Sequence, residues 1–404
     1  MKSSSVWAAC AASLLISVGA AAQPRPLVIN ANTSDPAPRA AWEAAVLRFQ
    51  KENPEIEVRL NIYDHESYKK SIRNWLTGAP PDVVFWFAGD RMRQFAAPGL
   101  LADVSELYTA QVRRSLHRSA VALVSLAGRQ YGVPYTYYPV GLYYRRDLVQ
   151  APRTWQELLS ACERLKREGL EPIAIGTKEL WPAAAWFDYL DLRLNGYAFH
   201  MELMEGRVAY TDPRVREVFD YWRELLDRGC YSRNHASSTW QESQSLLYQG
   251  KSALMLIGNY IVPQFPVEVR PKMDFAPFPT LRPGVGETEE APVNSLHIPA
   301  RARNVEGAKR FLAYVLRADV QEGLNRDMLQ IPANLQARTA DDRFLRAGRE
   351  HLARAQALTQ YFDRDTSEDL AQVAMKGFQE FMLYPARLDS ILETIEQARR
   401  RIYR

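Results

Sequence analysis

The chain has 404 residues, of which 47% are hydrophobic, 24% charged and 11% aromatic. This composition is that of a globular protein with room for two packed cores, and it excludes a disordered chain, a collagen-like fibre and a small disulfide scaffold. The formal net charge is only +4 and forms no basic tract, so we expect no nucleic-acid partner.

The first residues have the pattern of an export signal. Lys2 precedes an apolar run at 6–18, and three alanines at 20–22 provide a cleavage site. We therefore predict a signal peptide over residues 1–22, cleaved after Ala22, and a periplasmic protein. In that oxidising compartment Cys162 and Cys230 either form a disulfide or remain two buried thiols.

Strand and helix patterns alternate after residue 23. A strand at 27–29 is followed by a helix that ends at Asn53-Pro54, because proline disfavours helical backbone in the residue before it. An alternating strand at 56–62, a helix at 66–77 and a buried strand at 82–86 follow. This β-α-β-α-β order predicts a parallel sheet with crossover helices.

A second α/β region begins near Tyr135. Thr154 and Glu157 have capping-box spacing at a helix start, and Asp212 caps another helix that begins with a proline. Strands are predicted at 172–176, 251–257 and 274–279. We expect a surface loop at 280–292, a strand near 293–299 and helices over the rest of the chain.

Local enzyme motifs are missing. The Gly-Lys-Ser at 250–252 lacks the glycine of a phosphate-binding loop five residues earlier, and the H-E-x-x-H, G-x-S-x-G and G-x-G-x-x-G patterns do not occur. We therefore expect no metal, no cofactor and no catalytic residues. A secreted carbohydrate-active enzyme with a carboxylate pair stays open as an alternative, because such pairs are close in space rather than in sequence.

Aromatic residues stand at strand ends and in loops, interleaved with polar ones. Aromatic rings pack on the C–H face of a sugar, while carboxylates and amides bind its hydroxyls. By contrast, Trp42, Trp75, Trp155 and Trp222 lie on apolar helix faces and are expected in the core. The candidate ligand-binding residues are Asn32, Asp64, Trp86, Asp90, Arg91, Tyr135, Tyr138, Glu179, Trp181, Trp186, Trp240, Asn259, Tyr260 and Asn294.

Several segments resemble one family, the carbohydrate-binding proteins of bacterial ABC importers, to which the maltose-binding protein belongs. The resemblance extends over the whole mature chain. It is carried by GAPPDVVFW at 78–86, GLLAD at 99–103, YGVPY at 131–135, GLYYRRD at 141–147, NGYAF at 195–199, GKSALM at 250–255 and AKRFL at 308–312.

The resemblance implies an α/β fold of the type II periplasmic-binding-protein class, with two lobes joined by hinge crossings. Lobe 1 is expected over 23–134 and 280–320, and lobe 2 over 135–279 and 321–404. It adds Thr33, after the first strand, and Arg364, in a C-terminal loop, to the candidate ligand-binding residues. Tyr138 stands where the maltose-type pattern has a carboxylate, which argues against a maltodextrin ligand.

The function implied is that of a monomeric, non-catalytic receptor. It would capture a carbohydrate and deliver it to the transmembrane permease of an ABC importer with a cytoplasmic ATPase. A glycerol phosphodiester is a rival ligand. A phosphate group requires clustered arginines or a helix N-terminus, and Arg91 is the only obvious arginine for the cleft, so the sequence favours a neutral saccharide.

Overall fold

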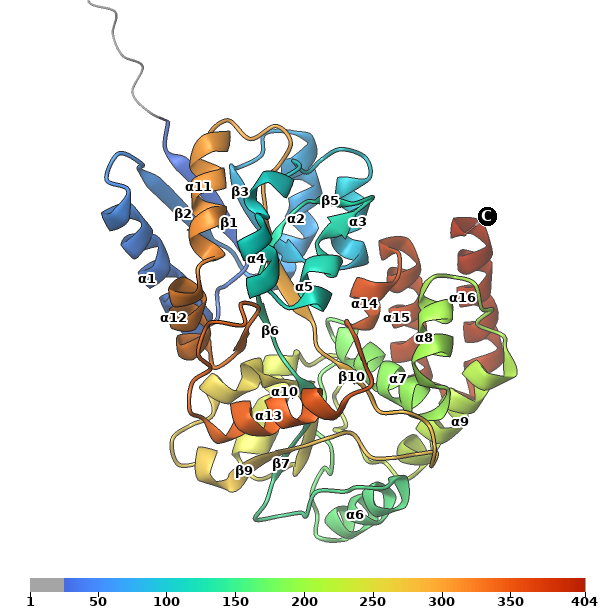
Figure 1. Cartoon of the computed structure of the whole chain (residues 1–404). Helices are drawn as coiled ribbons and strands as arrows, with labels where there is room; N and C mark the ends of the chain where they lie inside the picture. The colour runs from blue at the N-terminus through green and yellow to red at the C-terminus, as the bar shows by residue number, and fades with distance from the viewer. Residues whose placement is uncertain (1–24, 404) are drawn as a thin grey trace, which may run out of the picture.

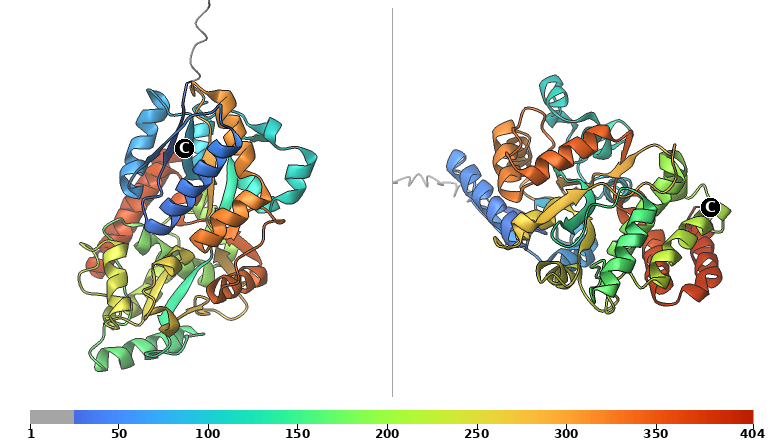
Figure 2. Two further views of the ribbon diagram at one scale, coloured as in Figure 1. Left: turned by 90° about the vertical axis from the view of Figure 1, so that its left-hand side faces the viewer. Right: turned by 90° about the horizontal axis from the view of Figure 1, so that it is seen from below.

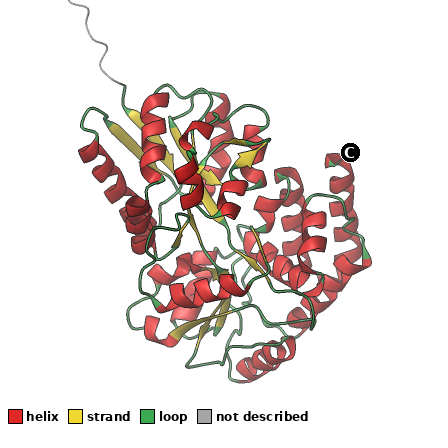
Figure 3. Ribbon diagram, viewed as in Figure 1, coloured by secondary structure: helices red, strands yellow, loops and turns green. Residues whose placement is uncertain are grey.

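The computed structural model describes residues 25–403, and the predicted signal peptide lies outside them. The chain forms two α/β lobes, one above the other in Figure 1. The strands lie inside each lobe and the helices cover them (Figure 3). Over residues 25–403, no helix combines the length and the apolar character needed to span a membrane.

Lobe 1 is built on a six-stranded sheet with the strand order β12-β6-β11-β3-β1-β2. Strand β1 is parallel to both β2 and β3, which confirms the predicted parallel unit, while β11 is antiparallel to β3 and β6. The strands are β1 (Leu27–Ala31), β2 (Val58–Ile62), β3 (Val83–Phe87), β6 (Val133–Tyr137), β11 (Val293–His297) and β12 (Ile331–Pro332).

The first helix ends where the sequence predicts, and the second begins and ends within one residue of the predicted bounds. The backbone N–H of Asn53 closes α1, and the Asp64 carboxylate accepts a hydrogen bond from the Ser67 N–H and so caps α2. The helices of lobe 1 are α1 (Pro36–Glu52), α2 (His65–Thr77), α3 (Asp90–Ala96), α4 (Ala110–Ser115), α5 (Arg118–Leu123), α11 (Val305–Val315) and α12 (Ala318–Met328).

Lobe 2 contains a small antiparallel sheet in the order β8-β7-β9, surrounded by helices. Its strands are β7 (Val140–Arg145), β8 (Leu254–Gly258) and β9 (Met273–Ala276). Its helices are α6 (Trp155–Arg167), α7 (Trp181–Leu194), α8 (Gly196–Met204), α9 (Pro213–Asp227), α10 (Trp240–Tyr248), α13 (Arg343–Arg354), α14 (Phe362–Asp365), α15 (Glu368–Leu383) and α16 (Leu388–Ile402).

Short elements complete the fold. Strands β4 (Ser125–Leu126) and β5 (Arg129–Gln130) form a hairpin, and β10 (Thr288–Glu290) pairs in parallel with β13 (Ala357–Thr359). The 3₁₀ helices are η1 (Ser105–Leu107), η2 (Asn259–Gln264), η3 (Arg270–Lys272) and η4 (Pro385–Arg387). Figure 2 shows that the C-terminal helices lie on the side of the molecule opposite α1.

Three predictions about elements need correction. In place of the strand at 172–176, Ile173 makes only isolated bridges to Tyr231 and Leu254. The segment 280–292 is not wholly a surface loop, because it contains β10, whose side chains are all buried. The C-terminal region also holds β12 and β13, each only two or three residues long, which is too short for a periodic pattern.

The predicted lobe boundaries at 280 and 320 also need correction. Helix α12 packs into the core of lobe 1, where Val320, Leu324 and Met328 join Trp42 and Phe311. The chain therefore returns to lobe 2 only after β12. At the other boundary β10 pairs with β13 beside α7 of lobe 2, so lobe 1 resumes at β11. Three segments, at 137–140, 290–293 and 332–343, connect the two lobes.

The two cysteines of the predicted mature chain are buried free thiols in the core of lobe 2. This matches the second of the two arrangements that the sequence leaves open.

Candidate functional site

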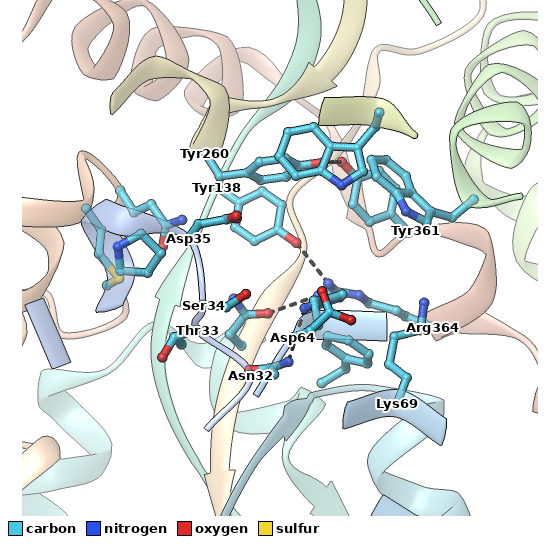
Figure 4. Close-up of a pocket in the computed structure, with 18 of the residues that line it drawn as sticks. Asn32, Thr33, Ser34, Asp35, Asp64, Lys69, Tyr138, Tyr260, Tyr361 and Arg364 are labelled. Carbon is cyan, nitrogen blue, oxygen red and sulfur yellow. Dashed lines mark hydrogen bonds between the residues drawn. The ribbon is translucent and has the colours of Figure 1, made fainter. Parts of the chain in front are cut away.

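A cavity of about 180 Å³ lies between the lobes, close to the ends of β1 and β3. Many predicted residues line it, from segments far apart in the sequence (Figure 4). They are Asn32, Thr33, Asp64, Tyr135, Tyr138, Trp181, Trp240, Tyr260, Asn294 and Arg364.

The wall formed by lobe 1 is polar and acidic. The loop after β1 contributes Asn32, Thr33 and Asp35, and the start of α2 contributes Asp64. The Ser67 N–H holds the pKa of Asp64 below its usual range, whereas burial, and then the nearby Asp64 charge, raise the pKa of Asp35. The buried Thr33 hydroxyl has no hydrogen-bond partner in the described protein, so a ligand hydroxyl can pair with it.

His65 contributes a neutral ring to the same wall. Burial, followed by the nearby Lys69 charge, lowers its pKa to about 3. The Asn32 side-chain amide nitrogen lies 3.3 Å from His65 Nδ1, within hydrogen-bond distance. The neutral ring therefore brings one hydrogen-bond donor and one acceptor to this wall.

The wall formed by lobe 2 is aromatic. The rings of Trp240 and Tyr260 meet edge to face with centroids 5.3 Å apart, and so do Tyr138 and Tyr260. The ring centroids of Trp181 and Tyr361 are 5.5 Å apart, and the hydroxyl oxygen of Tyr361 lies 3.4 Å from that of Tyr260. Helix starts position the two tryptophans: Trp181 begins α7, and Trp240 begins α10 directly after the N-cap Thr239, within the capping box that Thr239 and Glu242 form.

Arg364, on α14, joins the two walls. Its Nη2 donates to the Tyr138 hydroxyl at 2.9 Å and its Nη1 to Asn294 Oδ1 at 3.2 Å. The guanidinium carbon also lies 4.0 Å from the centre of the Phe87 ring. Protein groups therefore use part of the hydrogen-bonding capacity of Arg364, while the adjacent buried Asp363 lines the cavity as well.

Three predicted aromatic and amide residues lie outside the cavity. Strand β3 continues through Phe87, so Trp86 does not stand at the end of the strand. The indole N–H of Trp86 donates to the Arg91 carbonyl, and the Trp86 ring is buried beside Tyr68 and Phe95. Trp186 is a core residue of α7, and the amide of Asn259 donates to the Leu329 carbonyl. Their predicted roles as ligand contacts need correction, because other protein groups surround all three side chains.

The predicted charged residues Asp90, Arg91 and Glu179 do not line the cavity either. Asp90 bonds to Gln94 one turn along α3, and Arg91 pairs with Glu368 of lobe 2. Glu179 is half-buried outside the cavity, and this burial raises its pKa.

The sequence prediction also missed part of the lining. Five of the eleven missed residues adjoin a predicted one in the chain, so widening each predicted position by one residue finds these five: Ser34, His65, Phe87, Gln241 and Asp363. Met328 and Gln330 offer no such signal, because only the return of the chain through lobe 1 brings them to the cavity. The missed residues are Ser34, Asp35, Pro38, His65, Lys69, Phe87, Gln241, Met328, Gln330, Tyr361 and Asp363.

Known proteins match this arrangement. Residues 31–322 match the family model described as bacterial extracellular solute-binding protein. An uncharacterized ABC transporter extracellular-binding protein of Pyrococcus horikoshii is 23% identical over 301 residues, 71% of this chain and 67% of the relative. The multiple sugar-binding protein of Streptococcus mutans is 20% identical over 294 residues, 69% of this chain and 68% of the relative.

Among solved structures, the bacterial solute receptor AcbH has a TM-score of 0.90 and 28% identity, over 94% of this chain and 99% of its own. A chitin oligosaccharide binding protein has a TM-score of 0.86 and 18% identity, over 94% of this chain and 99% of its own, which shows the shared fold. The predicted two-lobe architecture is thereby confirmed. The chain belongs to the bacterial extracellular solute-binding proteins.

Proposed function

We propose that this protein is the carbohydrate receptor of an ABC importer, and that its ligand is a single neutral pyranose ring. One observation carries the proposal: the aromatic wall of lobe 2 faces the carboxylates, amide and hydroxyl of lobe 1 across one small cavity. The rings of Trp181, Trp240 and Tyr260 can pack on the C–H face of a sugar. The opposite wall supplies hydrogen-bond acceptors for its hydroxyls.

The charges of the lining disfavour an anionic ligand. The cavity lining contains three carboxylates, those of Asp35, Asp64 and Asp363, and two cationic side chains, those of Lys69 and Arg364. Both cations already have partners in the protein. Lys69 pairs with Glu66 at 3.1 Å, and Arg364 donates to Tyr138 and Asn294. The N-terminus of α2 is capped by Asp64. A glycerol phosphodiester would meet net negative charge, so the neutral saccharide is the better supported ligand.

The relatives suggest where to begin a ligand search. The receptor AcbH has an exclusive substrate preference for b-D-galactopyranose, and this chain is 28% identical to it. We infer a hexopyranose of this kind as the ligand and take D-galactose as the first candidate.

The test is a thermal-shift screen of the purified mature chain with single sugars, short oligosaccharides and glycerol phosphodiesters. Isothermal titration then measures affinity for each hit, and mass spectrometry of the recovered ligand tests for turnover. We expect a monosaccharide to raise the melting temperature and to be recovered unchanged. Stabilisation by an oligosaccharide or a phosphodiester alone would contradict the proposed ligand, and a cleaved product would support the carbohydrate-active enzyme instead.

The receptor role requires a membrane partner. We infer that the signal peptide of residues 1–22 exports the chain to the periplasm as a monomer, and that the loaded form docks with a permease driven by a cytoplasmic ATPase. A permease that contacts both lobes distinguishes loaded from empty receptor through its higher affinity for one arrangement. Loaded receptor should raise the ATPase rate of the reconstituted transporter, and an unchanged rate would contradict the transport role.

A further inference from the structure

Charged side chains join the two lobes at a second place, outside the cavity. Glu368 lies in the first turn of α15 in lobe 2, and its carboxylate is 3.4 Å from Arg91 Nη1 and 3.0 Å from Arg73 Nη2 of lobe 1. Neither Arg91 nor Glu368 lines the cavity. The contact is therefore distinct from ligand binding, although it brings the same two lobes together.

Arg91 is the unusual member of this group. Its side chain is only 4% exposed, its Nε is buried without a hydrogen-bond partner, and Glu368 is the only carboxylate that pairs with it among residues 25–403. Its guanidinium carbon lies 5.2 Å from the centre of the Trp86 ring. A buried cation that loses its only anionic partner is costly, whereas water can solvate it once the lobes separate.

The pair lies next to the segment that carries ligand-lining residues. Arg364 and Asp363 belong to α14, directly before α15, and α14 rests against α3, the helix that bears Arg91 (Figure 1). The contact is close: a Cβ placed on Gly89, at the start of α3, would lie 3.2 Å from the Arg364 carbonyl oxygen. An interaction that keeps α15 close to α3 therefore also keeps Arg364 in its position between the two walls of the cavity.

We propose that Arg91 and Glu368 form an interlobe latch that stabilises the closed arrangement and raises ligand affinity without touching the ligand. The part of this inference that concerns affinity rests on the proposed function. Apparent affinity is reduced by the fraction of receptor that is not in the binding-competent arrangement, so breaking the latch weakens binding by increasing the open population. Arg73, more than half exposed, adds a screened surface contact and contributes little.

The test compares Glu368→Gln, which removes the charge and keeps the shape, with Arg73→Gln as the matched surface control. Small-angle scattering of the ligand-free proteins measures the radius of gyration, and titration with D-galactose measures affinity. We expect Glu368→Gln to have a larger radius and about fivefold weaker binding, the lower end of typical coupling between sites. Arg73→Gln should change neither, and both variants should keep the melting temperature of the parent.

The exchange variant Arg91→Glu with Glu368→Arg restores an ion pair and should recover the smaller radius, which a merely structural role of either residue would not produce. An unchanged radius in Glu368→Gln would overturn the latch, and so would failure of the exchange variant to recover it. If the parent protein binds no sugar, the proposed function fails, while the scattering comparison still decides the latch because it needs no ligand.

Discussion

Trp181 is the residue expected to contribute most to ligand affinity. It lines the cavity as the first residue of α7, beside Tyr361 and Trp240. Replacing a central aromatic anchor costs about 2 kcal/mol or more, which is roughly 30-fold in affinity. Trp181→Ala should therefore bind the screened sugar about 30-fold more weakly in isothermal titration and retain the circular dichroism spectrum of the parent.

Trp222 is the matched control for this substitution. It is a fully buried tryptophan on α9, packed against Phe219 and Phe381, and it does not line the cavity. Trp222→Ala should lower the free energy of unfolding by about 3–5 kcal/mol, because it leaves a cavity in the core. The assignment of Trp181 would be wrong if its alanine variant behaved like that of Trp222, with early melting and normal binding.

Asp363 is the second residue for which we predict an effect on ligand affinity. Its carboxylate is buried at the cavity, and a hydrogen bond to a charged group contributes about 1.5–3 kcal/mol. Asp363→Asn keeps the shape and removes the charge, so sugar affinity should fall at least about tenfold. Glu179→Gln is the control, since Glu179 is a half-buried acid of lobe 2 outside the cavity lining, and it should bind normally. Equal affinities of the two variants would exclude Asp363 as a sugar contact.

Individual residues also show what sequence patterns can and cannot decide. Trp181 and Tyr260 were predictable because each follows an apolar segment and sits beside polar residues. Trp86 has the same pattern, yet its ring is buried beneath Tyr68 and Phe95. Whether an aromatic ring faces a cavity or the core depends on helices that pack against the strand from elsewhere in the chain. No local sequence signal encodes that packing.

At the scale of elements, N-cap residues made the predicted helix starts reliable. Thr154 and Asp212 mark the starts of α6 and α9 because their side chains accept hydrogen bonds from backbone N–H groups of the first turn. Strand β10 was missed for the opposite reason. Its residues are Thr288, Glu289 and Glu290, which are polar yet buried, and the Glu289 carboxylate is paired with Arg193 and lies 2.8 Å from His351 Nε2. Tertiary ion pairs of this kind leave no periodic signal in the sequence.

Strand β11 makes folding stability depend on pH through His297. Its Nδ1–H donates to the Tyr131 carbonyl at 2.7 Å and its Nε2 accepts from the Ser295 hydroxyl at 2.7 Å, so both ring nitrogens have protein partners when the ring is neutral. Burial lowers the pKa of His297 to about 4, whereas the ordinary value is 6.5. Between these values the unfolded chain binds a proton that the folded chain does not. His297 therefore lowers the free energy of unfolding as pH falls from 6.5 to 4, by at most about 1.4 kcal/mol per pH unit.

Denaturant titrations of the parent and of His297→Gln at pH 7, 5.5 and 4.5 measure this contribution. The parent should lose more stability than the variant over this range. Other groups act in the opposite direction, since burial raises the pKa of Asp188 to about 7 and of Asp365 to about 6, but they are common to both proteins and cancel in the comparison. Parallel loss of stability in the two proteins would show that His297 does not titrate as its burial requires.

At the scale of the molecule, the sequence predicted two lobes and several crossings but misplaced the boundaries. Helix α12 looks like any amphipathic helix, and nothing in its residues says that Leu324 and Met328 pack against lobe 1. The same crossings place Met328 and Gln330 at the cavity, so the misplaced boundary and the missed lining residues have one cause. A chain that passes between lobes more than once can be divided correctly only when its long-range packing is known.

Ligand binding should close the lobes, because the cavity takes residues from both and only three short segments connect them. Small-angle scattering should show a smaller radius of gyration for the parent at saturating sugar than without it. The Glu368→Gln variant, which we expect to be more open without ligand, should reach the same radius as the loaded parent once saturated, since a ligand that contacts both lobes shifts either protein toward the same closed arrangement. A radius that does not change at saturation in either protein would mean that the two lobes form one rigid receptor. In that case a permease would have to sense the sugar by direct contact rather than through the relative position of the lobes.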